Sequence, residues 1–154
     1  MAQRPSFDLT KLTTADKILL GGSLLMFIDT FLPWQRVCIG LLGICPSANA
    51  WGGNGSFAGV LLGLLTLALL IGEVMMVAGV AMPPNVPMST VLAGLTAGTV
   101  LFAVIKFLIV IGKSGSYGAW IGLILALVIA YGGYMKMQEA KAIAAPPGDT
   151  GFAA

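Results

Sequence analysis

Four apolar segments, separated by short polar connections, constrain the fold of this chain more than any other feature. The first runs from about Lys17 to Leu32, and the others cover about 57–82, 89–111 and 117–137. Each of the last three is long enough for a helix to cross a hydrocarbon core of roughly 30 Å. The first spans about 24 Å at 1.5 Å per residue, but Lys17 can extend its ammonium to the headgroups. The pattern predicts an all-α membrane protein, a bundle of four transmembrane helices.

The composition also favours a membrane protein. Of the 154 residues, 58% are hydrophobic and 9% are charged, whereas a soluble domain has about 25% charged residues. The net charge of +2 is too small to indicate a nucleic-acid partner. The chain has no histidine, which removes the commonest general base and the commonest metal ligand. We therefore expect no enzyme activity, no metal and no cofactor.

The basic residues predict the orientation of the chain. With four spans both termini lie on one side of the membrane, and only Arg36 and Lys113 flank the other side. The positive-inside rule then places the termini in the cytoplasm. Trp34 and Trp51 would belong to an aromatic belt at the outer interface. The basic residues on the cytoplasmic side are Arg4, Lys11, Lys17, Lys136 and Lys141.

The expected organisation has three parts. Residues 1–16 form a cytoplasmic segment, and residues 17–137 form the transmembrane domain. An outer loop at 33–56 lies within this domain. Residues 138–154 form a cytoplasmic tail, which we expect to be disordered because its end is rich in proline, glycine and small residues.

Three charged residues interrupt the apolar segments: Asp29, Lys106 and Glu73. A charge at the centre of a membrane helix costs on the order of 2.5–3.5 kcal/mol, so each needs a partner or a function. Asp29 and Lys106 both lie about 5–8 Å below the outer boundary. Their matching depth and opposite sign predict an interhelical ion pair, unless each side chain extends separately to the outer interface.

Glu73 lies about 24 Å from the start of its segment, too deep to meet Lys106. One hypothesis gives it a structural role, with its carboxyl hydrogen-bonded by Thr66 or by a partner chain. The alternative makes Glu73 a proton or cation site, since transporters use carboxylates within the membrane.

Small residues recur four positions apart in the last three segments. Such spacing lets helix backbones approach closely in lipid. We expect packing within the bundle, and the alternative is an interface with a second subunit. The residues are Gly59, Gly63, Gly94, Gly98, Gly118, Gly122, Ala126 and Ala130.

The two cysteines, Cys38 and Cys45, fall in the predicted outer loop. An oxidising compartment favours a disulfide between them. The bridge would enclose an apolar stretch, residues 39–44, which either packs back onto the bundle, dips into the outer leaflet or docks another protein.

Five stretches of the chain carry a likeness to other proteins: Phe27–Trp34, Ala48–Trp51, Val104–Leu108, Tyr117–Leu123 and Ala130–Tyr134. Their order is similar to that in small, uncharacterised four-span membrane proteins of actinobacteria, over about Lys17 to Glu139. The resemblance implies a bacterial cell membrane and no particular activity.

The sequence thus favours a non-enzymatic accessory or scaffolding subunit of a membrane complex. Its expected partners are the lipid bilayer and either other membrane subunits or further copies of itself. The alternative is a small transporter or channel, coupled to protons or cations through Glu73.

Overall fold

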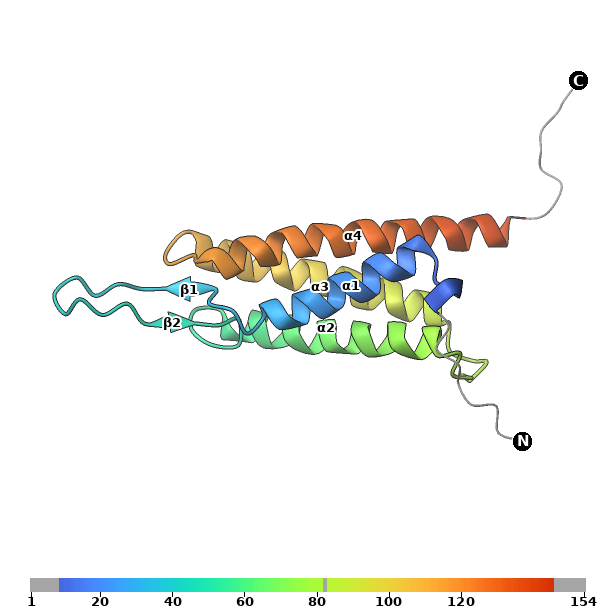
Figure 1. Cartoon of the computed structure of the whole chain (residues 1–154), viewed down its shortest axis with the longest axis horizontal. Helices are drawn as coiled ribbons and strands as arrows, with labels where there is room; N and C mark the ends of the chain where they lie inside the picture. Colours follow the sequence, from blue (N-terminus) through green and yellow to red (C-terminus); the bar gives the residue numbers. More distant parts are fainter. Residues whose placement is uncertain (1–8, 82, 146–154) are drawn as a thin grey trace, which may run out of the picture.

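A computed structural model of the chain describes residues 9–81 and 83–145. Within these residues a bundle of four α-helices carries a two-stranded antiparallel hairpin between its first two helices. Figure 1 shows the helices packed lengthwise, with the hairpin projecting beyond one end of the bundle. The elements are η1 (Leu9–Lys11), α1 (Thr14–Asp29), β1 (Gln35–Arg36), β2 (Ser47–Ala48), α2 (Ser56–Val77), α3 (Met88–Ile111) and α4 (Tyr117–Ala144).

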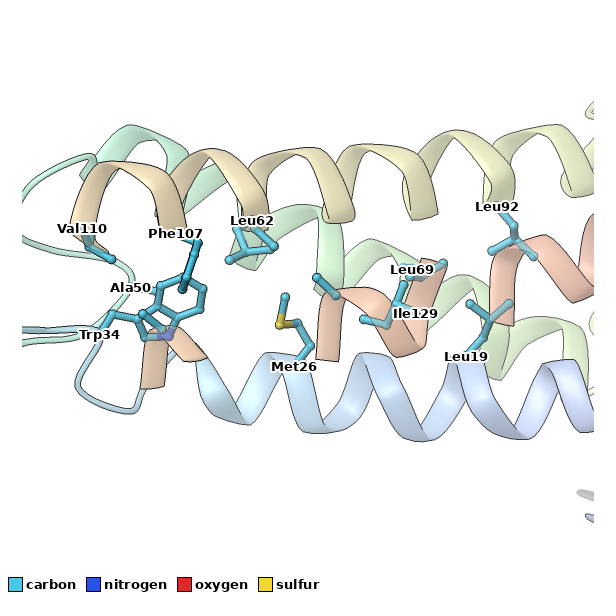
Figure 2. Close-up of a cluster of buried hydrophobic side chains, with 13 residues drawn as sticks. Leu19, Met26, Trp34, Ala50, Leu62, Leu69, Leu92, Phe107, Val110 and Ile129 are labelled. Atoms are coloured by element: carbon cyan, nitrogen blue, oxygen red, sulfur yellow. The ribbon is translucent and has the colours of Figure 1, made fainter. Parts of the chain in front are cut away.

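The four helices surround one hydrophobic core. α1 packs against α2 and α4, and α3 packs against the same two helices, so α1 and α3 occupy opposite corners. At the hairpin end the core is completed by Trp34 and Ala50, which lie outside the helices (Figure 2). The helical core residues along the axis include Leu19, Met26, Leu62, Leu69, Leu92 and Ile129.

Three of the helices are long and apolar enough to cross a membrane. They are α2, α3 and α4, with 22, 24 and 28 residues. α1 has 16 residues and is not among them. Large apolar side chains are exposed on the outer faces of the three long helices, including Leu64, Leu101, Leu108 and Leu127. Contiguous apolar surface of this kind is typical of contact with lipid or protein. The described part of the chain therefore holds three candidate membrane spans.

Local signals set the ends of α1 and α2. Thr13 and Asp16 form a capping box, in which each side chain accepts a hydrogen bond from the other residue's amide. α2 ends at Val77 because Gly79 adopts a φ of +64°, and the Val80 amide bonds back to the carbonyl of Met75 at 3.1 Å. The predicted second segment, which continued to residue 82, is longer than this helix.

The prediction of a disordered tail from residue 138 is wrong for its first part, because α4 continues to Ala144. Residues 137–144 consist largely of Met, Gln, Glu, Ala and Lys, which are strong helix formers and need no burial to remain helical. The predictions for residues 1–8 and 146–154 fall outside the described residues.

Candidate functional site

One lysine joins three helices at the end of the bundle opposite the hairpin. The Lys136 ammonium on α4 lies 2.6 Å from Asp16 Oδ1 on α1 and 2.9 Å from Glu73 Oε2 on α2. The Glu73 side chain is fully buried, whereas 18% of Lys136 and 17% of Asp16 stay exposed. We call Asp16, Glu73 and Lys136 the three-helix cluster. Because its members come from three elements, it ties α1 to both of its neighbours.

The cluster identifies the partner of Glu73. The sequence offered Thr66 or a partner chain, but Thr66 donates its hydroxyl to the carbonyl of Leu62 at 2.7 Å. The partner is Lys136 of the same chain. Counting depth at 1.5 Å per residue could have found it, since Lys136 lies about 28 Å along α4 and Glu73 about 26 Å along α2. In the sequence, Lys136 stands out only as one of the basic residues that indicate orientation.

Lys106 lies at the hairpin end and holds the loop that leads into α2. Its fully buried ammonium donates to the backbone carbonyls of Gly52 at 3.1 Å and Asn54 at 2.8 Å. The Asn54 carbonyl also accepts from Gln35 Nε2 at 2.7 Å, and the Asn54 amide donates to Gln35 Oε1 at 2.9 Å. Lys106 and Gln35 thus fix the base of the hairpin through the same loop residue.

The predicted ion pair between Asp29 and Lys106 is wrong. Both carboxylate oxygens of Asp29 are buried without a hydrogen-bond partner among the described residues, and Lys106 bonds to carbonyls instead. Extension to the interface is also wrong, since both side chains are buried. Their depths match, but α1 and α3 lie at opposite corners of the bundle. Depth can be counted from sequence, whereas position around the bundle cannot.

Four of the predicted packing glycines lie against loop residues, and Gly122 also faces the Asp29 carboxylate of α1. A Cβ on Gly118 would collide with the Pro33 carbonyl, and one on Gly122 would collide with the Trp34 ring. On α2, Gly59 lies in the same way under the Ala50 carbonyl, and Gly63 lies under the Trp51 ring. Trp34 is therefore buried against α4 and does not belong to an interfacial belt.

The other predicted small residues differ among themselves. Gly98 contacts Leu65 of α2, which is the helix-to-helix packing that the sequence predicts, whereas a Cβ added to Gly94 would have no neighbour within 4 Å. Ala126 is buried and Ala130 is half-buried. The spacing of small residues thus indicated close approach without identifying what approaches.

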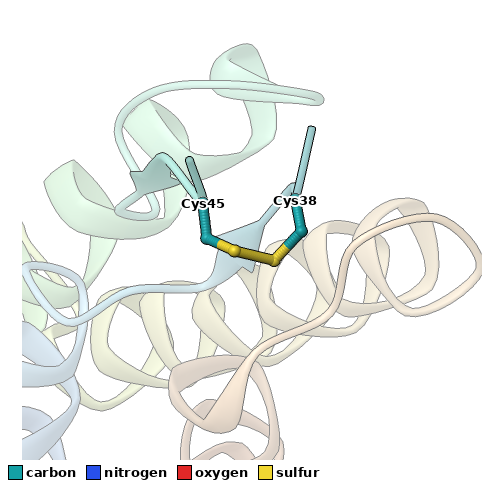
Figure 3. The surroundings of a disulfide bond; sticks show 2 residues. All are labelled: Cys38 and Cys45. Atoms are coloured by element: carbon teal, nitrogen blue, oxygen red, sulfur yellow. A yellow bond between two sulfur atoms is a disulfide. The ribbon is translucent and has the colours of Figure 1, made fainter. Parts of the chain in front are cut away.

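The hairpin is cross-linked and firmly anchored. Cys38 and Cys45 form the predicted disulfide, which joins its two arms (Figure 3). The base is tied to the connection between α3 and α4, where the Arg36 amide donates to the Ser114 carbonyl at 2.8 Å and the Ser116 amide donates to the Trp34 carbonyl at 3.0 Å.

Beyond this base the hairpin presents an apolar tip, which we define as Val37, Ile39, Leu41, Leu42 and Ile44. All five side chains are exposed, and Leu41 is 98% exposed. The tip extends away from the bundle (Figure 1), so the prediction that it packs back onto the helices is wrong.

Among the described residues, no group of His, Cys, Asp and Glu side chains is arranged to hold a metal ion. A scan against protein-family models finds no match, and searches of curated proteins and of solved structures find none either.

Proposed function

We propose that this protein is a non-enzymatic membrane protein that acts as an accessory or scaffolding subunit, with the apolar tip of its hairpin as the contact for another subunit. All four helices then lie in a bacterial cell membrane, the termini face the cytoplasm and the hairpin faces the outer side. The bacterial location rests on the resemblance to the actinobacterial four-span proteins.

The observation that carries the proposal is the exposed apolar tip on an ordered support. Five large apolar side chains of the hairpin are exposed. An isolated two-stranded hairpin of this size would be only marginally stable. Here a disulfide and the bonds to the connection between α3 and α4 hold it in place. Exposed apolar surface held in a fixed shape favours a protein contact.

The anchoring of α1 supports its place in the membrane. Its 16 residues extend about 24 Å, less than a hydrocarbon core of roughly 30 Å. However, the three-helix cluster holds its first turn, and Trp34 follows its last turn into the core. Since α1 packs along two long apolar helices, it would enter the membrane with them.

The surroundings of Glu73 favour a structural role over transport. Its carboxylate is paired with Lys136. Toward the hairpin end the core is largely apolar, with Met26, Leu62, Leu69 and Ile129 (Figure 2). Of the hydroxyls buried there, Ser23 and Thr66 donate to carbonyls of their own helices.

A photoreactive residue at position 41 tests the proposal in native membranes. We expect a cross-link to another membrane protein, and we expect Leu41→Ser combined with Leu42→Ser to abolish the corresponding complex on native gels. Lys113→Ser is the matched control, because Lys113 is exposed at the same end of the bundle outside the tip. An unchanged complex in the double variant would overturn the proposal. If proteoliposomes with the wild type show a proton-coupled flux and those with Glu73→Gln do not, the transporter alternative would be supported instead.

A further inference from the structure

A cavity of about 590 Å³ opens at the end of the bundle opposite the hairpin. Its walls come from the first turns of α1 and α3 and the last turns of α4, with Met76 of α2. All these segments lie at the same end of the bundle in Figure 1. The volume falls within the range of small-molecule sites, about 300–1,000 Å³.

The walls of the cavity are apolar and adaptable. Leu19 and Leu92 line it from opposite corners of the bundle, and Met76 and Met137 add flexible thioethers. Ala93 keeps the cavity wide because its side chain is short, whereas Gly133 lies against the Thr96 methyl. An alkyl chain fits such a slot, whereas a polar solute would find few hydrogen-bond partners there.

The rim carries the polar groups. Ser89 and Thr90 bring hydroxyls, and Glu139 and Lys141 bring charges of opposite sign. Neither of these two charged side chains forms an ion pair within the described residues. Lys136 also lines the cavity, but Asp16 and Glu73 already occupy its ammonium. The lining also includes the hydroxyls of Thr13 and Thr96. The rim therefore offers one cation and one anion without ion-pair partners, together with the hydroxyls of Ser89 and Thr90.

We propose that this cavity binds one zwitterionic phospholipid, whose acyl chain fills the slot and whose headgroup carries both a phosphate and an ammonium group. Lys141, Ser89 and Thr90 meet the phosphate through charge and hydrogen bonds. Glu139 meets the ammonium. This site lies at the other end of the bundle from the hairpin tip, so it does not depend on the proposed protein contact.

Native mass spectrometry of the full chain in mild detergent tests the proposal. Phosphatidylethanolamine and phosphatidylglycerol are added in equal amounts as probes. We expect one retained phosphatidylethanolamine per chain. Ala93→Phe fills the slot and should weaken retention about tenfold or more, equivalent to roughly 1.4 kcal/mol. Ala97→Phe is the matched control, because Ala97 is exposed one turn further along α3 and does not line the cavity. Equal retention by both variants would overturn the proposal.

Two further experiments test which headgroup binds and what occupies the cavity. Glu139→Gln should remove the preference for ethanolamine over glycerol, because Glu139 meets the ammonium group. Lys141→Gln should weaken the retention of both lipids, because both carry the phosphate. An unchanged preference in Glu139→Gln would overturn the assignment of the headgroup. If Ala93→Phe does not fold, Ala140→Phe at the rim serves the same purpose. A photoreactive residue at position 137 should cross-link to lipid. A cross-link to residues 1–8 or 146–154, or to a second copy, would show a different occupant and overturn the proposal.

Discussion

Trp34 donates its indole N–H to the backbone carbonyl of Asp29 at 3.0 Å, and so folds the chain back over the end of α1. Trp51 makes the corresponding bond to the hydroxyl of Thr30 at 3.1 Å. The Trp34 indole packs on glycines of α4, and the Trp51 indole packs on a glycine of α2. Together with the three-helix cluster, these bonds hold the shortest helix to both of its neighbours at both ends.

The three-helix cluster predicts strong coupling between Glu73 and Lys136. Lys136→Met leaves the buried Glu73 carboxylate without compensation, and we expect a loss of about 3–5 kcal/mol in the free energy of unfolding. Glu73→Gln should cost less, because Lys136 keeps Asp16. The double variant should recover most of the loss. Denaturation with SDS, followed by circular dichroism, measures each value.

Lys141→Met is the control for this series, since Lys141 lies on the same helix without an ion pair in the described part. Its stability should stay within about 0.5 kcal/mol of the wild type. Additive losses in the double variant would contradict the coupling.

Lys106 and Asp29 should respond differently to removal of their charges. Lys106→Met removes two charge-assisted hydrogen bonds to the loop before α2. We expect the free energy of unfolding to fall by about 1.5–3 kcal/mol or more. Hydrogen exchange should also become faster at Asn54. Asp29→Asn should be neutral or stabilising, because the buried carboxylate has no bond to lose in the described structure. Equal losses in both variants would point to an ion pair after all.

The glycines beneath the loop predict a contrast between two substitutions of the same kind. In Gly59→Ala the new methyl would meet the carbonyl of Ala50, which is backbone and cannot rotate away. We expect a loss of about 1–3 kcal/mol from overpacking. In Gly94→Ala the new methyl would meet nothing within 4 Å. The free energy of unfolding should rise by about 0.5–1 kcal/mol, because alanine is more stable than glycine in a helix interior. Thermal unfolding in detergent compares the two variants. Similar melting temperatures would exclude the close approach of Gly59 to the Ala50 carbonyl.

Periodicity and length predicted the helices well, because both are local properties of the chain. The third segment, predicted at 89–111, matches α3 at Met88–Ile111 to within one residue. The disulfide also followed from position alone. The partners of the charges did not follow, since they depend on which corner each helix occupies. Lys106 shows this best, because its acceptors are loop carbonyls that no charge pattern in the sequence marks.

The disulfide predicts a hairpin whose base does not depend on the bridge. Replacing Cys38 and Cys45 by serine opens a loop of eight residues and should cost roughly 2.5 kcal/mol by the chain-entropy estimate. The helices should stay intact, because Gln35 still pairs with Ala48 and bonds to Asn54. Only residues 37–46 should lose protection from hydrogen exchange. Intact mass under non-reducing conditions should show the wild type lighter by two hydrogens. Two free, alkylatable thiols in native membranes would contradict both the bridge and the outer location that we propose for the hairpin.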